Sequence, residues 1–224
     1  MSAHPDEPSK PWETVRRGLL MLVSSPAGAG KTSLSRRLVA DFAGMTLSIS
    51  ATTRRARPGE EEGREYFFKT REEFEAMIAR GELLEWAEVN GQLYGTPKAP
   101  VIAALEAGGD VMFDIDWQGA RQIAADCPED SVRVFILPPS WRDLARRLHA
   151  RAQDSSEVIE QRLHLGKREI THWGEYDYVI VNKDFDRAYA DLIHIYRAER
   201  MKPGRNPWLP PFVDGLLAEE VDPI

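Results

Sequence analysis

An eight-residue segment, Ser-Pro-Ala-Gly-Ala-Gly-Lys-Thr at residues 25–32, constrains the fold of this chain more than any other feature. It follows a nearly continuous apolar run, Gly18 to Ser24, that is typical of a buried strand. It precedes Thr32 to Phe42, where apolar residues recur at the spacing of one helix face. A strand, a glycine-rich turn and a helix in this order match the template G-x-x-x-x-G-K-[ST], whose backbone N–H groups bind phosphate. Only Ser25 departs from it, because the template has glycine there.

The residue types of this segment predict a separate role for each residue in a nucleotide site. Gly28 and Gly30 allow close approach of the backbone and unusual φ values. Lys31 is expected to bring a cation to the β- and γ-phosphates, which makes it a catalytic candidate, and the Thr32 hydroxyl is expected to ligate Mg²⁺. The predicted ATP-binding residues are Ser25, Pro26, Ala27, Gly28, Ala29, Gly30, Lys31, Thr32 and Ser33.

Beyond residue 42, apolar runs continue to alternate with helical patterns. Strands are predicted at 110–115, 132–137 and 178–181, and helices at 118–125, from Ser140 onward and at 186–201. Such alternation is typical of an α/β fold with a parallel sheet covered by helices on both faces. Residues 47–96 break the rhythm, with short strands at 66–68, 83–89 and 92–94 around a helix at 71–80. They predict a small α+β insertion.

Three stretches inside and after this insertion carry a family resemblance. They are Ser-Ala-Thr-Thr-Arg-Arg-Ala-Arg-Pro-Gly-Glu-Glu-Glu-Gly-Arg-Glu-Tyr-Phe-Phe at 50–68, Glu-Trp-Ala-Glu-Val-Asn-Gly-Gln-Leu-Tyr-Gly-Thr at 85–96, and Asp-Ile-Asp-Trp-Gln-Gly at 114–119. Together with the phosphate loop they resemble guanylate kinases, which are nucleoside monophosphate kinases of the P-loop type. The resemblance covers roughly residues 18–200. It implies transfer of the γ-phosphoryl group from ATP to GMP in purine nucleotide metabolism.

The resemblance also implies a domain organisation. The kinase domain is expected at 15–202, with its core at 15–46, 97–139 and 169–202, a GMP-binding subdomain at 47–96 and a helical lid at 140–168. Residues 1–14 are expected to form a flexible extension. Residues 203–224 contain five prolines, and we expect a proline-rich tail there that is loose or, less often for such a composition, docked through its apolar residues.

Arginines and a tyrosine in the first stretch suit the phosphate of an acceptor nucleotide. Arg54 and Arg57 flank a turn, and guanidinium forks bind phosphate oxygens in pairs. A solvated basic turn paired with nearby glutamates is the alternative. The resemblance implies a GMP phosphate clamp of Arg54, Arg57 and Tyr66, with Glu60 and Tyr94 also on the GMP side.

Guanine presents two adjacent donors, N1–H and the N2 amino group, and a carboxylate complements that edge. Adenine lacks both donors and would leave a buried carboxylate unpaired. The resemblance assigns this carboxylate to Glu85, and hydroxyls suited to guanine O6 to Ser50 and Thr96. An exposed acidic residue beside Trp86 is the alternative for Glu85.

Two aspartates end a predicted strand at the sheet edge where ligands of α/β proteins collect. The resemblance puts Asp114 on the metal and GMP side, and Asp116 near guanine or its ribose. A helix-capping role is the alternative for Asp116. Asn182 ends the last strand at the same edge. It is a candidate ATP contact near the adenine, with a turn-forming role equally open.

The predicted lid is rich in arginine. By position, Arg147, Arg151 and Arg162 match the lid arginines of the family and are catalytic candidates. Phosphoryl transfer depends on positioning and charge neutralisation, which such residues supply on closing over the phosphates. GMP attacks as an anion, so no general base is required.

Composition excludes several other classes. A net charge of −7 and a pI near 5.4 argue against a nucleic-acid binder. Cys127 is the only cysteine, so no internal disulfide forms, and we expect it to be buried. No apolar run reaches the roughly 18 residues of a membrane span, and the N-terminus lacks a secretory signal. We therefore expect a cytoplasmic protein without a membrane partner, in an oligomeric state that the sequence leaves open.

Three rival functions follow from the same residues. A kinase for AMP, a pyrimidine monophosphate or a ribose bisphosphate would share the phosphate loop. A non-catalytic binding module of the guanylate-kinase-like type would share the fold, but it would have lost loop or lid residues that are present here. A generic ATPase would have no use for the acceptor clamp.

Overall fold

The computed structural model describes residues 16–89, 91–150 and 156–219. Its centre is a parallel sheet in the order β2-β7-β1-β8-β9. The strands are β1 (Leu20–Ser24), β2 (Met45–Leu47), β7 (Asp110–Asp114), β8 (Ser131–Leu137) and β9 (Tyr178–Val181). The strands predicted from apolar runs are confirmed. The sheet also contains β2, which was not predicted because it is too short to stand out in the sequence.

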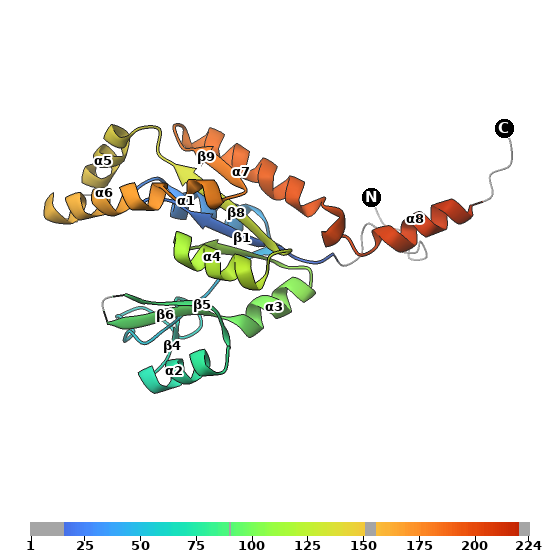
Figure 1. Cartoon of the computed structure of the whole chain (residues 1–224), viewed down its shortest axis with the longest axis horizontal. Coiled ribbons are helices and arrows are strands. Elements are labelled where there is room, and N and C mark those ends of the chain that lie inside the picture. Colours follow the sequence, from blue (N-terminus) through green and yellow to red (C-terminus); the bar gives the residue numbers. More distant parts are fainter. Residues whose placement is uncertain (1–15, 90, 151–155, 220–224) are drawn as a thin grey trace.

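Helices cover both faces of this sheet, as predicted (Figure 1). Successive residues of β1 alternate between the two cores: Met21 packs with α1, α5 and α7, and Leu22 packs with α3 and α4. The helices are α1 (Lys31–Asp41), α3 (Lys98–Glu106), α4 (Trp117–Asp126), α5 (Trp141–Ala150) and α7 (Phe185–Arg200). Cys127, at the end of α4, is buried as expected.

The insertion forms its own small sheet below the main body in Figure 1, in the order β4-β3-β6-β5. Its elements are β3 (Ala51–Thr52), β4 (Phe67–Phe68), α2 (Arg71–Ala79), β5 (Leu83–Val89) and β6 (Gln92–Pro97). Phe74, fully buried, anchors α2 to Leu83 and Leu93 of this sheet. Thr70 begins α2 with a capping box in which Glu73 is the reciprocal partner. The insertion therefore has a separate apolar core.

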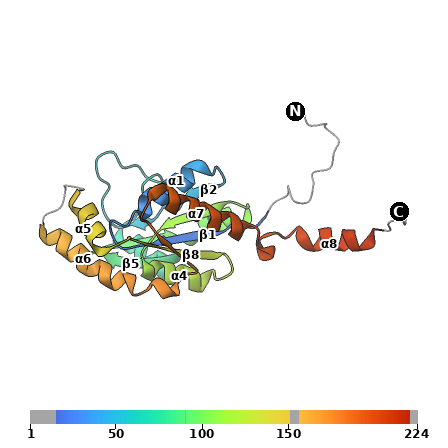
Figure 2. The same ribbon diagram turned by 90° about the horizontal axis from the view of Figure 1, so that it is seen from above.

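Two helices at the far side of the phosphate loop make up the region expected to be a lid: α5 and α6 (Ser156–Ile170) (Figures 1 and 2). Ser140 accepts a hydrogen bond from the Asp143 backbone N–H at 3.0 Å, so it caps α5 as predicted. Arg151 lies outside the described residues. A 3₁₀ turn, Trp173–Glu175, then leads into β9.

The C-terminal region differs from a loose tail. Arg205, at the end of the 3₁₀ turn Pro203–Arg205, is 4% exposed and donates to the Asp130 carbonyl. The body thus extends slightly past the expected boundary at 202. Beyond it, α8 (Leu209–Ala218) has no buried residue and projects from the body in both views (Figures 1 and 2). The expected extension at 1–14 falls outside the described residues. In the part of the chain that is described, no helix is long and apolar enough to cross a bilayer.

Candidate active site

The phosphate loop joins β1 to α1 with its two central glycines in the left-handed region. Gly28 has a φ of 90° and Gly30, which caps α1, a φ of 105°. A Cβ on Gly30 would lie 2.3 Å from Asn182 Nδ2, and one on Gly28 would lie 3.0 Å from Leu148. Glycine is therefore required at both positions by conformation, and at Gly30 also by space. Ser25, in place of the first glycine, donates its hydroxyl to the Pro26 carbonyl at 3.0 Å.

Asn182 supports this loop from behind. Its Nδ2 donates to the Ala29 carbonyl at 2.7 Å, and the residue is 3% exposed. Its own carbonyl accepts from Arg147 Nη2 at 2.9 Å. The side chain is thus occupied beneath the loop, and the expected adenine contact has no support from this geometry. Arg147, one of the lid candidates, is tied to the same strand end.

Lys31 points to the end of β7. Its Nζ lies 2.7 Å from Asp114 Oδ1 and donates to the Ile115 carbonyl at 2.9 Å. Asp114 therefore balances the charge of the lysine. Among the described residues, no group of three or more His, Cys, Asp or Glu side chains could hold a metal ion by itself.

A cavity of about 380 Å³ lies over the loop. Beside Lys31 and Thr32, its walls include Asp114 and two residues of α6, Arg162 and Glu169. The remaining wall residues come from the loop, namely Ser25, Pro26, Ala27, Gly28 and Gly30. The structure thus brings the predicted ATP-binding segment and one predicted lid arginine to the same cavity. Ser33 lies exposed in the first turn of α1.

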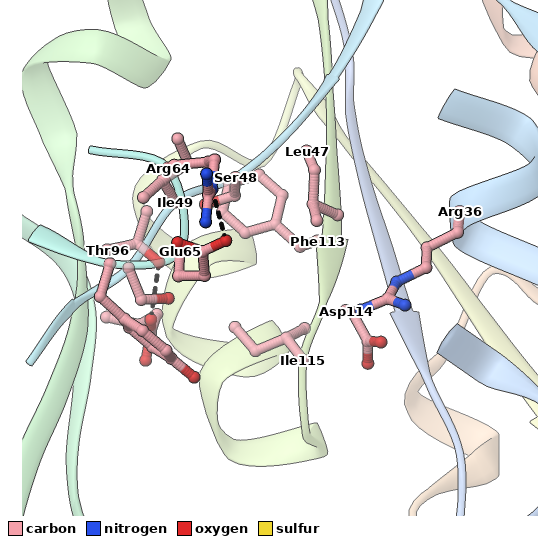
Figure 3. A pocket seen from close by; sticks show the side chains of 13 residues that line it. Arg36, Leu47, Ser48, Ile49, Arg64, Glu65, Thr96, Phe113, Asp114 and Ile115 are labelled. Atoms are coloured by element: carbon pink, nitrogen blue, oxygen red, sulfur yellow. Dashed lines mark hydrogen bonds and ion pairs between the residues drawn. The ribbon is translucent and has the colours of Figure 1, made fainter. Parts of the chain in front are cut away.

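A second cavity, of about 530 Å³, lies between the main sheet and the insertion (Figure 3). Five predicted GMP-side residues line it: Ser50, Tyr66, Glu85, Thr96 and Asp114. Asp114 is shared with the cavity over the loop, so the two cavities meet at the end of β7. Figure 3 shows Asp114 and Arg36 across the cavity from Thr96.

Glu85 and Thr96 form the polar floor of this second cavity. Thr96, 2% exposed, donates its hydroxyl to Glu85 Oε1 at 2.8 Å. Burial raises the pKa of Glu85 to about 7, and the nearby Asp116 charge adds to the rise, although the Thr96 hydrogen bond opposes it. A carboxyl in this state gains most from a ligand that supplies two N–H donors.

The arginine cluster is organised by Glu60. Arg54 Nη2 lies 2.9 Å from both Glu60 oxygens, and Glu60 also accepts from the Arg57 backbone N–H at 2.8 Å. Arg54 stacks over the Tyr66 ring at 5.2 Å, and Tyr66 meets Tyr94 edge-on. Glu60 therefore binds Arg54 through one guanidinium nitrogen, and Nη1 of Arg54 donates to the Arg55 carbonyl at 2.8 Å. This pairing of an arginine with a glutamate in the turn is the alternative to the clamp described above. The Arg57 side chain is exposed.

Asp116 caps α4, since its carboxylate accepts from the Gly119 backbone N–H at 2.9 Å. The helix-capping alternative therefore describes one part of its role. Its charge still contributes to the raised pKa of Glu85.

Four charged residues of the two cavities were missed by reasoning from sequence: Arg36, Arg64, Glu65 and Glu169. Helical spacing could have found two of them. Arg36 lies four residues after Thr32 on α1, and Glu169 lies seven after Arg162 on α6, so each shares a face with a predicted residue. Arg64 and Glu65 lie in a loop and carry no comparable signal.

Comparison with known proteins gives a consistent result. The family model for guanylate kinase matches residues 17–199. The guanylate kinase of Caulobacter vibrioides is 57% identical over 205 residues, covering 92% of this chain and 96% of that protein. That of Maricaulis maris is 55% identical over 91% of this chain and 94% of its own length. The crystal structure of guanylate kinase from Anaplasma phagocytophilum superposes with a TM-score of 0.73 at 35% identity, covering 92% of this chain and 99% of that one. The resemblance noted in the sequence is confirmed, and the chain belongs to the guanylate kinase family.

Proposed function

We propose that this chain transfers the γ-phosphoryl group of ATP to GMP and releases ADP and GDP. The observation that carries the proposal is the pair of cavities that share Asp114, one over a phosphate loop and one floored by Glu85 and Thr96. A donor phosphate and an acceptor nucleotide could meet at that shared edge. Membership of the guanylate kinase family supports the same reaction.

Guanine selectivity is assigned to the floor of the acceptor cavity. The Glu85 carboxylate accepts from guanine N1–H and N2–H, and the Ser50 hydroxyl donates to guanine O6. Thr96 can donate to O6 as well only by turning its hydroxyl away from Glu85. Adenine has neither donor, so it would leave the Glu85 carboxylate desolvated and unpaired.

The acceptor phosphate is assigned to Arg54, Arg57, Tyr66 and Tyr94. Glu60 cannot contact a phosphate favourably because both are anions; its role is to hold Arg54 in place through the bidentate pair. Asp116 caps α4 and is not among the residues that line the acceptor cavity, but its charge helps to raise the pKa of Glu85.

Phosphoryl transfer then needs little covalent chemistry from the protein. An oxygen of the GMP phosphate attacks the γ-phosphorus, a new P–O bond forms, and the bond to the β-phosphate oxygen breaks with ADP as leaving group. Lys31, released from Asp114, and the lid arginines Arg147, Arg151 and Arg162 are assigned to the charge that spreads over the transferred group.

The donor set at the cavity junction fits Mg²⁺ bound together with ATP. The Thr32 hydroxyl and the Asp114 carboxylate are oxygen ligands of the kind Mg²⁺ prefers, and the ion usually takes only one or two protein groups besides phosphates and waters. When bound, Mg²⁺ neutralises charge on the β- and γ-phosphates. We place the reaction in purine nucleotide metabolism in the cytoplasm, with ATP and GMP as partners.

A parallel assay tests this proposal. ADP release from ATP and Mg²⁺ is measured with GMP, AMP, CMP and UMP in separate reactions. Fast release with GMP alone is the expected result. Fast release with another monophosphate would keep a kinase and overturn the guanine assignment, whereas slow release with all four would favour a binding module.

A further inference from the structure

Glu169 lies at the root of the lid helix and faces the phosphate loop. Two residues of α6 line the cavity over the loop, Arg162 and Glu169. Glu169 lies two turns after Arg162 on the same helix face. Between them, Gly166 is buried, and a Cβ there would lie 3.2 Å from Pro26 and 3.3 Å from Trp141. The helix thus packs closely against the loop at this point, and glycine permits the approach.

The carboxylate of Glu169 lies near two groups of the loop that are expected to bind phosphate. The Lys31 cation and the Ala27 backbone N–H both lie close enough to stabilise its charged form. Its Oε2 is buried and accepts no hydrogen bond from any group in the described ranges. Burial, the largest effect, leaves the pKa of Glu169 raised above its usual value despite these two contacts.

Backbone N–H groups and a lysine are the groups with which such a loop binds phosphate. A carboxylate that takes one of these N–H groups and faces the lysine stands where a phosphate oxygen would be favourable. An anion with one oxygen left unpaired is a costly arrangement, so it is easily displaced by a better ligand.

We propose that Glu169 is a positioning residue that competes with the donor's phosphates for the phosphate loop. Filling the loop expels the Glu169 carboxylate, and because Arg162 is on the same rigid helix, the expulsion moves this arginine too. Donor binding is thereby coupled to the position of the lid. The inference rests on the proposed function, since it requires ATP as the ligand of the loop.

Competition makes a prediction of definite sign. Glu169→Gln removes the charge while keeping an oxygen for the Ala27 N–H. It should therefore bind ATP more tightly than the unsubstituted chain, by about five- to tenfold, a common size for coupling between two sites. A residue that only braced the loop would give the opposite sign, because its loss would weaken binding.

Calorimetric titration with ATP in the absence of GMP measures this without relying on turnover. Glu160→Gln, on an exposed part of the same helix, is the matched control and should leave the dissociation constant unchanged. Glu169→Ala is the second variant and should also tighten ATP binding. Titration with GMP reports whether the acceptor cavity, and hence the fold, is intact in each variant.

The outcomes separate this inference from the proposed function. Tighter ATP binding by both Glu169 variants supports competition. Unchanged or weaker binding by Glu169→Gln, with normal binding by the unsubstituted chain, overturns the inference alone. Failure of the unsubstituted chain to bind ATP overturns the proposed function and the inference together.

Discussion

The state of Glu85 predicts that guanine recognition depends on pH. Its pKa is about 7, and the ionised form is the one that accepts two N–H donors. Between pH 8 and pH 6 the ionised fraction falls from about nine-tenths to about one-tenth. GMP affinity should therefore fall about tenfold over this range, because below pH 7 the Glu85 carboxyl must lose its proton before it can bind guanine. Glu85→Gln should lose this dependence and bind GMP weakly at both values.

The same shift predicts an opposite effect on stability. The pKa in the folded chain, about 7, lies above the ordinary value of 4.5, so the folded chain binds more protons between these values. Stability should consequently fall as pH rises from 4.5 to 7, and the charged Glu85 should cost at most about 3 kcal/mol above pH 7. Glu85→Gln should therefore unfold at a higher denaturant concentration at pH 8, with little difference at pH 4.5.

Two titrations check this reasoning. GMP binding is measured by calorimetry at pH 6, 7 and 8 for both proteins, so that protonation of the nucleotide phosphate affects each equally. Urea unfolding is measured at pH 4.5 and 8. A Glu85→Gln variant with the same pH dependence of GMP binding as the unsubstituted chain, or with lower stability at pH 8, would refute a charged Glu85 as the guanine acceptor.

Three further substitutions have distinct expected effects. Thr96→Val removes the hydroxyl that Glu85 accepts and should weaken GMP binding about tenfold, with ATP binding unchanged in calorimetry. Lys31→Met should lower kcat by about 10²- to 10³-fold in the ADP-release assay, while circular dichroism stays native. Gly30→Ala forces a side chain into a φ of 105° and against Asn182, so it should lose about 2 kcal/mol or more in urea unfolding together with ATP binding. Equal ATP affinity in Gly30→Ala would contradict the packing described for the loop.

The parallel core was predictable because its strands are short apolar runs, and β1 and β7 are followed by recognisable motifs. Helix α3 was missed because apolar residues occupy nearly every position from 99 to 105 and a proline interrupts them, so no helical period is visible. Helix α8 was missed for a related reason, since two prolines near its start are typical of a loop but also suit the first turn of a helix.

The residues of the site divide in the same way. Lys31 and Glu85 lie in motifs with local spacing, so they could be identified from the sequence. The contacts of Asn182 with Ala29 and of Glu169 with the loop join segments far apart in the chain, and only the packing of β9 and α6 on the loop brings them together. Glu60 contacts Arg54 with both carboxylate oxygens, and the sequence could not distinguish this contact from a direct ligand role.

The central claim is that the two cavities exchange a phosphoryl group. ATP radiolabelled at its γ-phosphorus is incubated with the protein, Mg²⁺ and GMP, and the products are separated by chromatography. We predict that the label appears in GDP in step with ADP formation. Label in inorganic phosphate, or label that stays in ATP, would contradict it.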